Sequence, residues 1–188
     1  MTPYSPSNQD SLVEIPICVD LDGTLIQTDM LWVSCLGLLR KNVFYLSLLP
    51  WWLCRGKAHL KQQISNRVDV AIDGLPYNSV LIDFLHRQKA SGRRIVLATA
   101  THQKFASAVA QHLEIFDEVI ASDARNNLSG VAKRDRLVER FGRNRFDYAG
   151  NSRVDLKIWP HSRGAILVNV SRRVREQAEY VSNVVKIL

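Results

Sequence analysis

Two carboxylates stand two positions apart in the hexapeptide DLDGTL (residues 20–25), directly after a short apolar run at residues 15–20. Side chains at alternate positions of an extended segment project to the same side, so Asp20 and Asp22 should point together. Such a pair can bind a divalent cation and can supply a nucleophile and a general acid/base. Gly23 permits the sharp backbone turn that must follow. We therefore expect a catalytic centre here rather than a solvated pair of surface acids.

Three later segments carry polar side chains where a strand ends or a helix begins. Thr99 follows the apolar run at residues 94–99, Lys133 lies in GVAKRDRL (residues 130–137), and Asn151 opens the polar part of GNSRVD (residues 150–155). Carboxyl ends of neighbouring parallel strands meet at one edge of a sheet, and ligands bind there. The family resemblance given below implies that these segments converge on the Asp20 turn.

Alternating strand and helix patterns predict the elements that position these residues. Five short apolar runs with little polar alternation are typical of strands buried on both faces. They span residues 15–20, 94–99, 118–122, 145–149 and 165–169. Helical spacing covers residues 76–90, 104–113 and 132–141. Strands alternating with helices indicate an α/β fold, a mostly parallel sheet in a three-layer sandwich.

Roughly sixty residues separate the first two predicted strands, far more than one crossover needs. We interpret residues 28–80 as an inserted helical cap, followed by the rest of the core at 81–170. Its longest uncharged run, residues 42–54, is flanked by basic residues and is too short for a membrane span, which needs ~20 apolar residues. This run is either the buried face of the cap or an interfacial element with tryptophan at headgroup depth and basic residues on anionic lipid.

Composition and charge exclude some classes of protein. The chain has 46% hydrophobic and 23% charged residues, which excludes a disordered or collagen-like chain. A formal charge of +7 favours anionic partners, namely phosphate esters, nucleic acid or an acidic membrane surface. Nucleic acid is not expected, because the basic residues are dispersed and no stacking motif accompanies them.

The cysteines and the chain ends suggest where the protein works. Cys18, Cys35 and Cys54 form no closely spaced pair, so we expect no disulfide framework and a reducing, cytoplasmic setting. Residues 1–13 are polar, lack lysine and arginine, and are expected to form a flexible arm rather than a signal peptide. Residues 171–188 are expected to form a helix or a linker.

The four polar segments resemble, in order, motifs I to IV of the haloacid dehalogenase (HAD) superfamily, over residues 14–170. The third resembles the form found in the phosphoserine-phosphatase-like branch. This resemblance implies a Rossmann-like core at 14–27 and 81–170, with a C1-type helical cap at 28–80. It also implies a phosphatase or phosphomutase, because haloacid dehalogenases lack an acid at the position of Asp22 and P-type ATPases carry threonine there.

A closer resemblance is to the N-terminal HAD domain of fused UbiA-type prenyltransferases. It rests on DLDGTLIQTDMLW, LPWWLCRGKAHLK, LATATHQKFASAVAQHL and FDYAGNSRVDLKIW. This resemblance implies a covalently linked membrane prenyltransferase as partner and a location at the cytoplasmic face of the membrane. It also implies that the ending VVKIL leads into the membrane part.

The HAD resemblance implies a role for each site residue. Asp20 would attack the phosphorus and form an aspartyl-phosphate, and Asp22 would protonate the leaving alcohol and then activate water. Thr99 and the amide of Ala100 would hold phosphoryl oxygens. Lys133 would bind the phosphoryl group and offset the charge between it and the nucleophile. The substrate would be a phosphorylated small molecule, a phosphosugar or a lipid-linked prenyl phosphate.

The same resemblance implies Mg²⁺ as cofactor, held by Asp20, Asp22 and Asn151, with Asp155 behind them. Asn151 departs from the family pattern, which has aspartate there, and the change removes one negative charge from the site. Hard divalent cations favour carboxylate oxygen, so weaker Mg²⁺ binding is expected. Three interpretations stay open: a working phosphatase with reduced metal affinity, a weakened domain kept as a regulatory or docking module for a membrane prenyltransferase, and an engineered Asp→Asn change.

Overall fold

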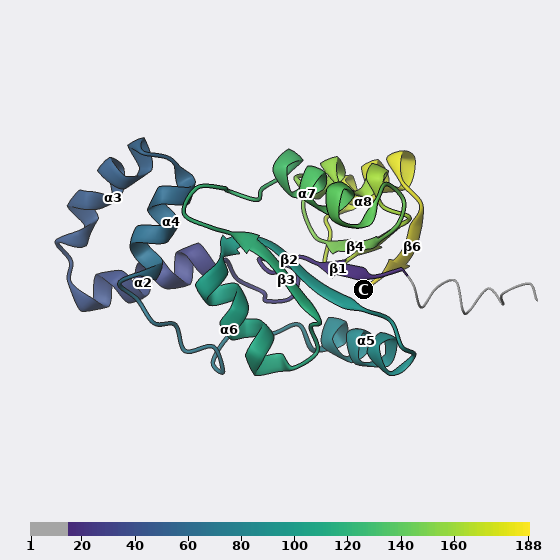
Figure 1. Cartoon of the computed structure of the whole chain (residues 1–188), viewed down its shortest axis with the longest axis horizontal. Coiled ribbons are helices and arrows are strands. Elements are labelled where there is room, and N and C mark those ends of the chain that lie inside the picture. Colours follow the sequence, from purple (N-terminus) through teal and green to yellow (C-terminus); the bar gives the residue numbers. More distant parts are fainter. Residues whose placement is uncertain (1–14) are drawn as a thin grey trace, which may run out of the picture.

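A computed structural model describes residues 15–188, and at its centre lies a six-stranded parallel sheet of order β3-β2-β1-β4-β5-β6 (Figure 1). The strands are β1 Ile17–Val19, β2 Ile95–His102, β3 Glu118–Ser122, β4 Asp147–Gly150, β5 Gly164–Leu167 and β6 Val184–Ile187. β1 lies between β2 and β4, so the segments that follow these three strands meet at one edge of the sheet. The expected arm at residues 1–13 lies outside the described residues.

Helices cover both faces of the sheet, which confirms the predicted α/β three-layer fold. α5 (Ser79–Ala90) and α6 (Gln103–Leu113) lie on one face, and α7 (Val131–Phe141) and α8 (Arg172–Val181) lie on the other (Figure 1). Alternate residues of β1 enter different cores. Ile17 and Val19 pack with the α5 and α6 side, whereas Cys18 packs with the α7 and α8 side. This burial on both faces explains why the strand sequences are continuously apolar.

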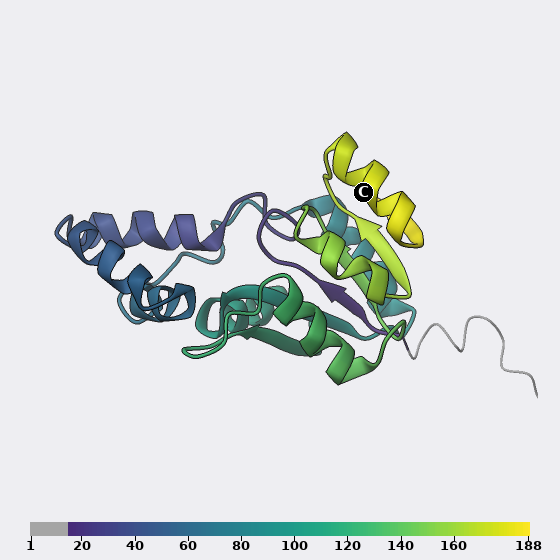
Figure 2. The same ribbon diagram turned by 90° about the horizontal axis from the view of Figure 1, so that it is seen from above.

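Three helices between β1 and α5 project beyond the carboxyl ends of the strands (Figures 1 and 2). They are α2 Met30–Lys41, α3 Tyr45–Cys54 and α4 Lys57–Ser65. Asp29 caps the start of α2, where its Oδ1 accepts hydrogen bonds from the amides of Leu31 (2.7 Å) and Trp32 (3.2 Å). The helices enclose a small core of their own, made by Leu38, Trp52, Ile64 and Val68. The expected cap range, 28–80, encloses all three helices.

The two chain segments that join these helices to the core lie side by side. Ile26 forms an antiparallel bridge with Tyr77, and the amide of Gln27 donates to the carbonyl of Pro76 at 2.8 Å. The amide of Asn78 donates to the carbonyl of Leu25 at 2.9 Å. The entry and exit of the cap are therefore fastened together at one place.

The end of the chain confirms the expected helix over residues 171–188 in part, and it adds a strand that was not expected. α8 stops at Val181, and Val184–Ile187 form strand β6, which pairs in parallel with β5. The last residues favour this outcome because β-branched side chains suit a strand. The edge of β5 also offers backbone partners, and the amide of Leu188 donates to the carbonyl of Leu167 at 2.8 Å.

β2 also differs from expectation, because it continues to His102 instead of ending at Thr99. Its pairing with β3 shifts register between Ala98 and His102 and then resumes at Ser122. A strand boundary of this kind depends on the partner strand, which the local pattern does not report. The extension places Thr101 on the strand, beside the Asp20 turn.

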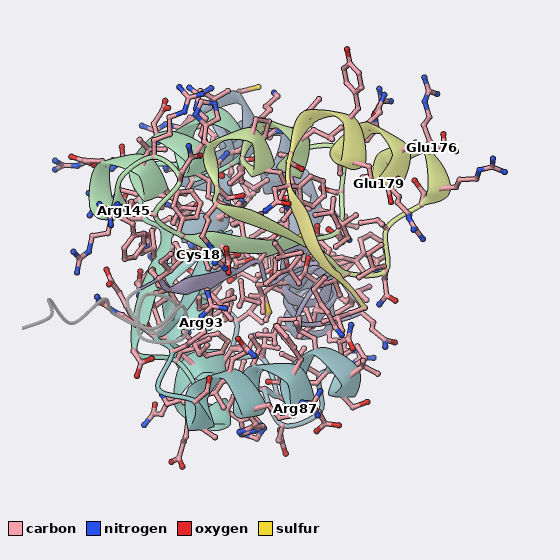
Figure 3. The ribbon with its side chains drawn as sticks, turned by 90° about the vertical axis from the view of Figure 1, so that its right-hand side faces the viewer. Cys18, Arg87, Arg93, Arg145, Glu176 and Glu179 are labelled. Atoms are coloured by element: carbon pink, nitrogen blue, oxygen red, sulfur yellow. The ribbon has the colours of Figure 1, made fainter. Side chains whose placement is uncertain are left out.

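An ion cluster anchors the end of the sheet that lies away from the cap. The Asp147 carboxylate is 1% exposed and accepts hydrogen bonds from Arg93 at 2.7 Å and from Arg163. Figure 3 looks onto this end, with Arg93 and Cys18 labelled near the centre of the view. Both cations neutralise a buried carboxylate at the start of β4, so the cluster holds the ends of neighbouring segments in register.

Candidate active site

Asp20 stands at the carboxyl end of the central strand, on a turn that its own backbone stabilises. The amide of Leu25 donates to the carbonyls of Asp20 (3.3 Å) and Leu21 (3.0 Å), which closes the turn. Gly23 adopts a left-handed φ of 73°, as the sharp turn requires. The Asp20 carboxylate is 13% exposed, and its Oδ1 accepts a hydrogen bond from the amide of Leu21 at 2.9 Å.

Lys133 reaches this carboxylate from the first turn of α7. Its Nζ lies 2.7 Å from Oδ1 of Asp20 and 3.0 Å from the hydroxyl of Tyr148. The two charged residues are 113 positions apart in the sequence, so the fold itself creates the pair. The Lys133 side chain is only 5% exposed, which makes this a buried ion pair with strong positional constraint.

A hydrogen-bond network extends the pair toward Asn151. The Tyr148 hydroxyl donates to Oδ1 of Asp155 at 3.0 Å, and burial together with the nearby carboxylates raises the pKa of Tyr148 well above its usual value. Oδ2 of Asp155 accepts hydrogen bonds from the amides of Asn151 (3.1 Å) and Ser152 (2.9 Å). Tyr148 is thus a neutral phenol that links Lys133 to Asp155, and Asp155 holds the loop that carries Asn151.

Asp22 is held on the same turn by one donor from the cap and one from the core. Its Oδ1 accepts from the amide of Met30 at 2.7 Å, at the start of α2, and its Oδ2 accepts from the hydroxyl of Thr101 at 2.7 Å. Burial raises the pKa of the Asp22 carboxyl, although these hydrogen bonds act in the opposite direction. A carboxyl that keeps its proton more readily than usual suits the role of a general acid.

Burial also dominates the electrostatics of Asp20. It raises the pKa of the Asp20 carboxyl to about 7, while the Lys133 ammonium acts to lower it and the neighbouring Asp155 and Asp22 act to raise it. A single lysine therefore does not fully offset the negative charge gathered at this turn. Further positive charge bound beside Asp20 would favour the ionised, nucleophilic form.

The turn opens into a cavity of about 730 Å³ between the core and the cap. The core contributes Asp20, Asp22, Ala100, Thr101, Lys133 and Asn151 to its wall, and the cap contributes Leu31, Leu53, Lys57, Leu60 and Lys61. Lys61 closes one side, because its Nζ donates to the carbonyl of Ala100 at 2.6 Å and to Oδ1 of Asn127 at 2.9 Å. Burial lowers the pKa of Lys61. The cavity thus combines oxygen ligands and cations on the core side with apolar and basic side chains from the cap.

Most residues that the sequence singled out come together here, and one lies behind the wall. Asp20, Asp22, Ala100, Lys133, Asn151 and Asp155 all line the cavity. Thr99 is fully buried, and its Oγ1 accepts a hydrogen bond from the amide of Thr101 at 2.9 Å. Among the residues of β2, Ala100 and Thr101 line the cavity, so the role expected of Thr99 stays a prediction.

Sequence reasoning did not identify Thr101 and Tyr148 as parts of the site. The hydroxyl of Thr101 bonds Asp22, and that of Tyr148 bonds both Lys133 and Asp155. Side chains two positions apart on a strand share a side, so the pattern Thr-Ala-Thr contained a signal for Thr101 once β2 was extended. Tyr148 lay within a predicted buried strand, and a buried tyrosine hydroxyl requires a partner.

The donor set at the turn fits a hard divalent cation such as Mg²⁺. The carboxylate of Asp20, the backbone carbonyl of Asp22 and the side-chain oxygen of Asn151 are all oxygen donors, which Mg²⁺ prefers. Gly23 leaves room for Asn151, because a Cβ at position 23 would lie 2.2 Å from Nδ2 of Asn151. The Asn151 side chain lines the same cavity as Asp20 and Asp22.

No family model matches the chain. The uncharacterised protein y4nM of Sinorhizobium fredii is 34% identical over 156 residues, which are 82% of this chain and 30% of that protein. The chain therefore spans less than a third of the length of this relative.

Solved structures show the same fold. A HAD family hydrolase of Salmonella enterica serovar Typhi has a TM-score of 0.66 at 14% identity, covering 93% of this chain and 68% of that one. A phospho-aspartyl intermediate analogue of phosphoserine phosphatase has a TM-score of 0.59 at 12% identity, covering 93% of each chain. The cobalt-bound deoxy-D-mannose-octulosonate 8-phosphate phosphatase of Haemophilus influenzae has a TM-score of 0.54 at 12% identity, covering 95% and 80%. The chain thus has the fold of HAD hydrolases, and its resemblance to UbiA-fused domains stays a prediction.

Proposed function

We propose that this chain is a phosphomonoester hydrolase in which Asp20 is the nucleophile. The observation that carries the proposal is the buried pair of Asp20 and Lys133, 2.7 Å apart, at the carboxyl end of the central strand and facing a cavity. Asp22 stands on the same turn with a raised pKa. The shared fold with phosphoserine phosphatase, one structure of which is an analogue of the phospho-aspartyl intermediate, supports this chemistry.

In the proposed reaction, Asp20 carries the phosphoryl group and Asp22 carries the proton. A carboxylate oxygen of Asp20 attacks the phosphorus, the bond from phosphorus to the leaving oxygen breaks, and Asp22 gives its proton to that oxygen. Asp22 then takes a proton from a water molecule, which attacks the phosphorus and releases phosphate from Asp20. Lys133 offsets the negative charge of the nucleophile and the phosphoryl group throughout.

The proposed cofactor is Mg²⁺, held by Asp20, Asp22 and Asn151, with Asp155 keeping the Asn151 loop in place. When bound, Mg²⁺ neutralises phosphoryl charge and orients the group for attack. Because Asn151 supplies a neutral oxygen where a carboxylate would add charge, we expect a lower affinity for the metal than an aspartate would give.

The cavity wall suggests an alcohol with apolar character as the leaving group. Leu31, Leu53 and Leu60 of the cap line it together with Lys57 and Lys61. Apolar walls bind an alkyl or prenyl chain, whereas the two lysines suit a phosphate charge. A lipid-linked or prenyl phosphate is therefore the preferred substrate class, ahead of a phosphosugar.

A matched pair of variants tests the proposal. Turnover of p-nitrophenyl phosphate, a prenyl phosphate and sugar phosphates is measured with and without Mg²⁺ for the wild type, Asp20→Asn and Asp135→Asn. Asp135→Asn is the same substitution on the surface of α7, where the Asp135 side chain is 62% exposed. We expect Asp20→Asn to lose at least about 10³-fold in turnover, as nucleophile removal does, and Asp135→Asn to match the wild type. Equal turnover in Asp20→Asn would contradict the proposal.

A non-catalytic docking or regulatory module is a second candidate function, favoured by the reduced charge of the site. Within residues 15–188, no group of three or more histidine, cysteine, aspartate or glutamate side chains is placed to hold a metal ion. If neither the wild type nor Asn151→Asp hydrolyses any phosphoester with Mg²⁺ present, this second candidate replaces the first.

A further inference from the structure

The cap exposes large apolar side chains that nothing else in residues 15–188 covers, and most of them lie at its outer end. Of the fifteen large hydrophobic residues that are exposed within residues 15–188, eight fall within residues 32–53. They are Trp32, Leu36, Val43, Phe44, Leu46, Leu48, Trp51 and Leu53. Phe44 is 79% exposed and Trp51 is 59% exposed, values that a folded protein rarely leaves for aromatic rings without a partner.

α3 is the centre of this surface. Its sequence, YLSLLPWWLC, contains no charged residue, yet Trp52 is its only buried side chain. Trp52 packs with Leu38, Ile64 and Val68, and Tyr45 and Leu49 pack partly against the same core. Leu46, Leu48 and Trp51 of this helix are exposed. In Figures 1 and 2, α3 lies at the end of the cap farthest from the sheet, where it is free to meet a large flat partner.

The charge around this surface has one sign. Residues 30–68 contain no aspartate or glutamate, whereas they contain six lysine or arginine residues. Arg40 and Lys41 precede α3, and Arg55 and Lys57 follow it, and all four are exposed. The guanidinium of Arg55 lies 5.1 Å from the ring centre of Trp51, so charge and aromatic surface occur at the same point. Exposed aromatic rings flanked by basic residues favour an anionic partner with an apolar interior.

We propose that the cap tip, defined as residues 43–54, lies on the surface of an anionic bilayer. Phe44 and Trp51 would enter at headgroup depth, and Arg40 and Arg55 would bind lipid phosphates. A protein partner is less well matched, because protein interfaces carry rims of mixed charge and this surface has no acidic residue. None of the helices within residues 15–188 is long and apolar enough to cross a bilayer. This proposal does not depend on the proposed phosphatase activity.

Sedimentation with lipid vesicles tests the contact. The whole chain is mixed with vesicles of pure phosphatidylcholine or of phosphatidylcholine with phosphatidylglycerol, and the partition coefficient is measured. We expect binding to the anionic vesicles that weakens at high salt. Phe44→Ser/Trp51→Ser should lower the partition coefficient at least about tenfold, and Arg40→Gln/Arg55→Gln about 25-fold, at about fivefold for each basic residue.

Tyr180→Ser is the matched control, because Tyr180 is 91% exposed on α8, at the other end of the molecule (Figure 1). It should bind as the wild type does, and thermal unfolding should show that every variant is folded. No binding by the wild type, equal binding to neutral vesicles, or undiminished binding by Phe44→Ser/Trp51→Ser would overturn the proposal. Sedimentation velocity without lipid tests whether a second copy of the chain covers this face instead. A dimer that Phe44→Ser/Trp51→Ser abolishes, together with no vesicle binding, would assign the face to that second copy.

Discussion

Replacing Lys133 by methionine should lower the free energy of unfolding by an amount that can be estimated from the structure. At 2.7 Å and an effective dielectric constant of about 20, the attraction between Lys133 and Asp20 is about 6 kcal/mol, before desolvation is subtracted. Removing one partner of such a buried pair lowers the free energy of unfolding by about 3–5 kcal/mol. Asp20→Asn should instead raise the free energy of unfolding at pH 8, because burial raises the pKa of that carboxyl to about 7 and so disfavours its ionised form in the folded protein, while the Lys133 ammonium keeps the Tyr148 hydroxyl at 3.0 Å as an acceptor.

The double variant turns this expectation into a measurement of coupling. With both charges gone, no buried charge is left unpaired, so Asp20→Asn/Lys133→Met should be about 2 kcal/mol more stable than the sum of the two single changes predicts. The assay is urea unfolding at pH 8 in EDTA, above the pKa of about 7 to which burial raises the Asp20 carboxyl. Lys186→Met, at an exposed position, is the matched control and should change the free energy by less than about 0.5 kcal/mol. Additive changes in the free energy of unfolding would refute the reasoning, because they would show that the two charges do not interact.

Other changes in the site have separate consequences. Asn151→Asp should tighten Mg²⁺ binding about tenfold in calorimetry, because a charged oxygen binds the cation more strongly than an amide oxygen; unchanged affinity would mean that residue 151 is not a ligand. Asp155→Asn should lower the free energy of unfolding by about 2 kcal/mol in urea, since that buried carboxylate accepts from the amides of Asn151 and Ser152; a loss below about 0.5 kcal/mol would show that the loop does not depend on it. Lys61→Met should raise KM for a phosphoester about tenfold with kcat within about twofold, because Lys61 supplies charge for binding from the cap; a fall confined to kcat would contradict this role.

The fold was largely predictable because its signals are local. Continuous apolar runs identify strands that are buried on both faces, and the helical spacing between them indicates parallel crossovers. The convergence of Asp20, Lys133 and Asn151 was predictable through the resemblance to the HAD motifs, and the meeting of parallel strand ends at one edge gives part of its physical reason. Lys133 confirms this most clearly, because it contacts Asp20 across 113 residues.

What the sequence did not indicate depends on partners distant in the chain. β6 exists because β5 leaves an edge to pair with, and β2 extends past Thr99 because β3 continues beside it. Thr101 lies at the site only because β2 extends past Thr99. Tyr148 fitted the pattern of a core residue, and its second role became visible only when α7 placed Lys133 beside its hydroxyl. Local patterns report burial, but they do not report which polar atoms meet.

The most direct test of the central claim is to find the phosphoryl group on the protein. The chain is mixed with a phosphoester and Mg²⁺, quenched in acid, treated with borohydride and mapped by peptide mass spectrometry. The account predicts an acyl phosphate at Asp20, seen as a reduced side chain at that position in the wild type and absent in Asp20→Asn. Hydrolysis with the phosphoryl group on another residue, or with no modified residue under conditions that trap a known aspartyl-phosphate enzyme, would contradict it.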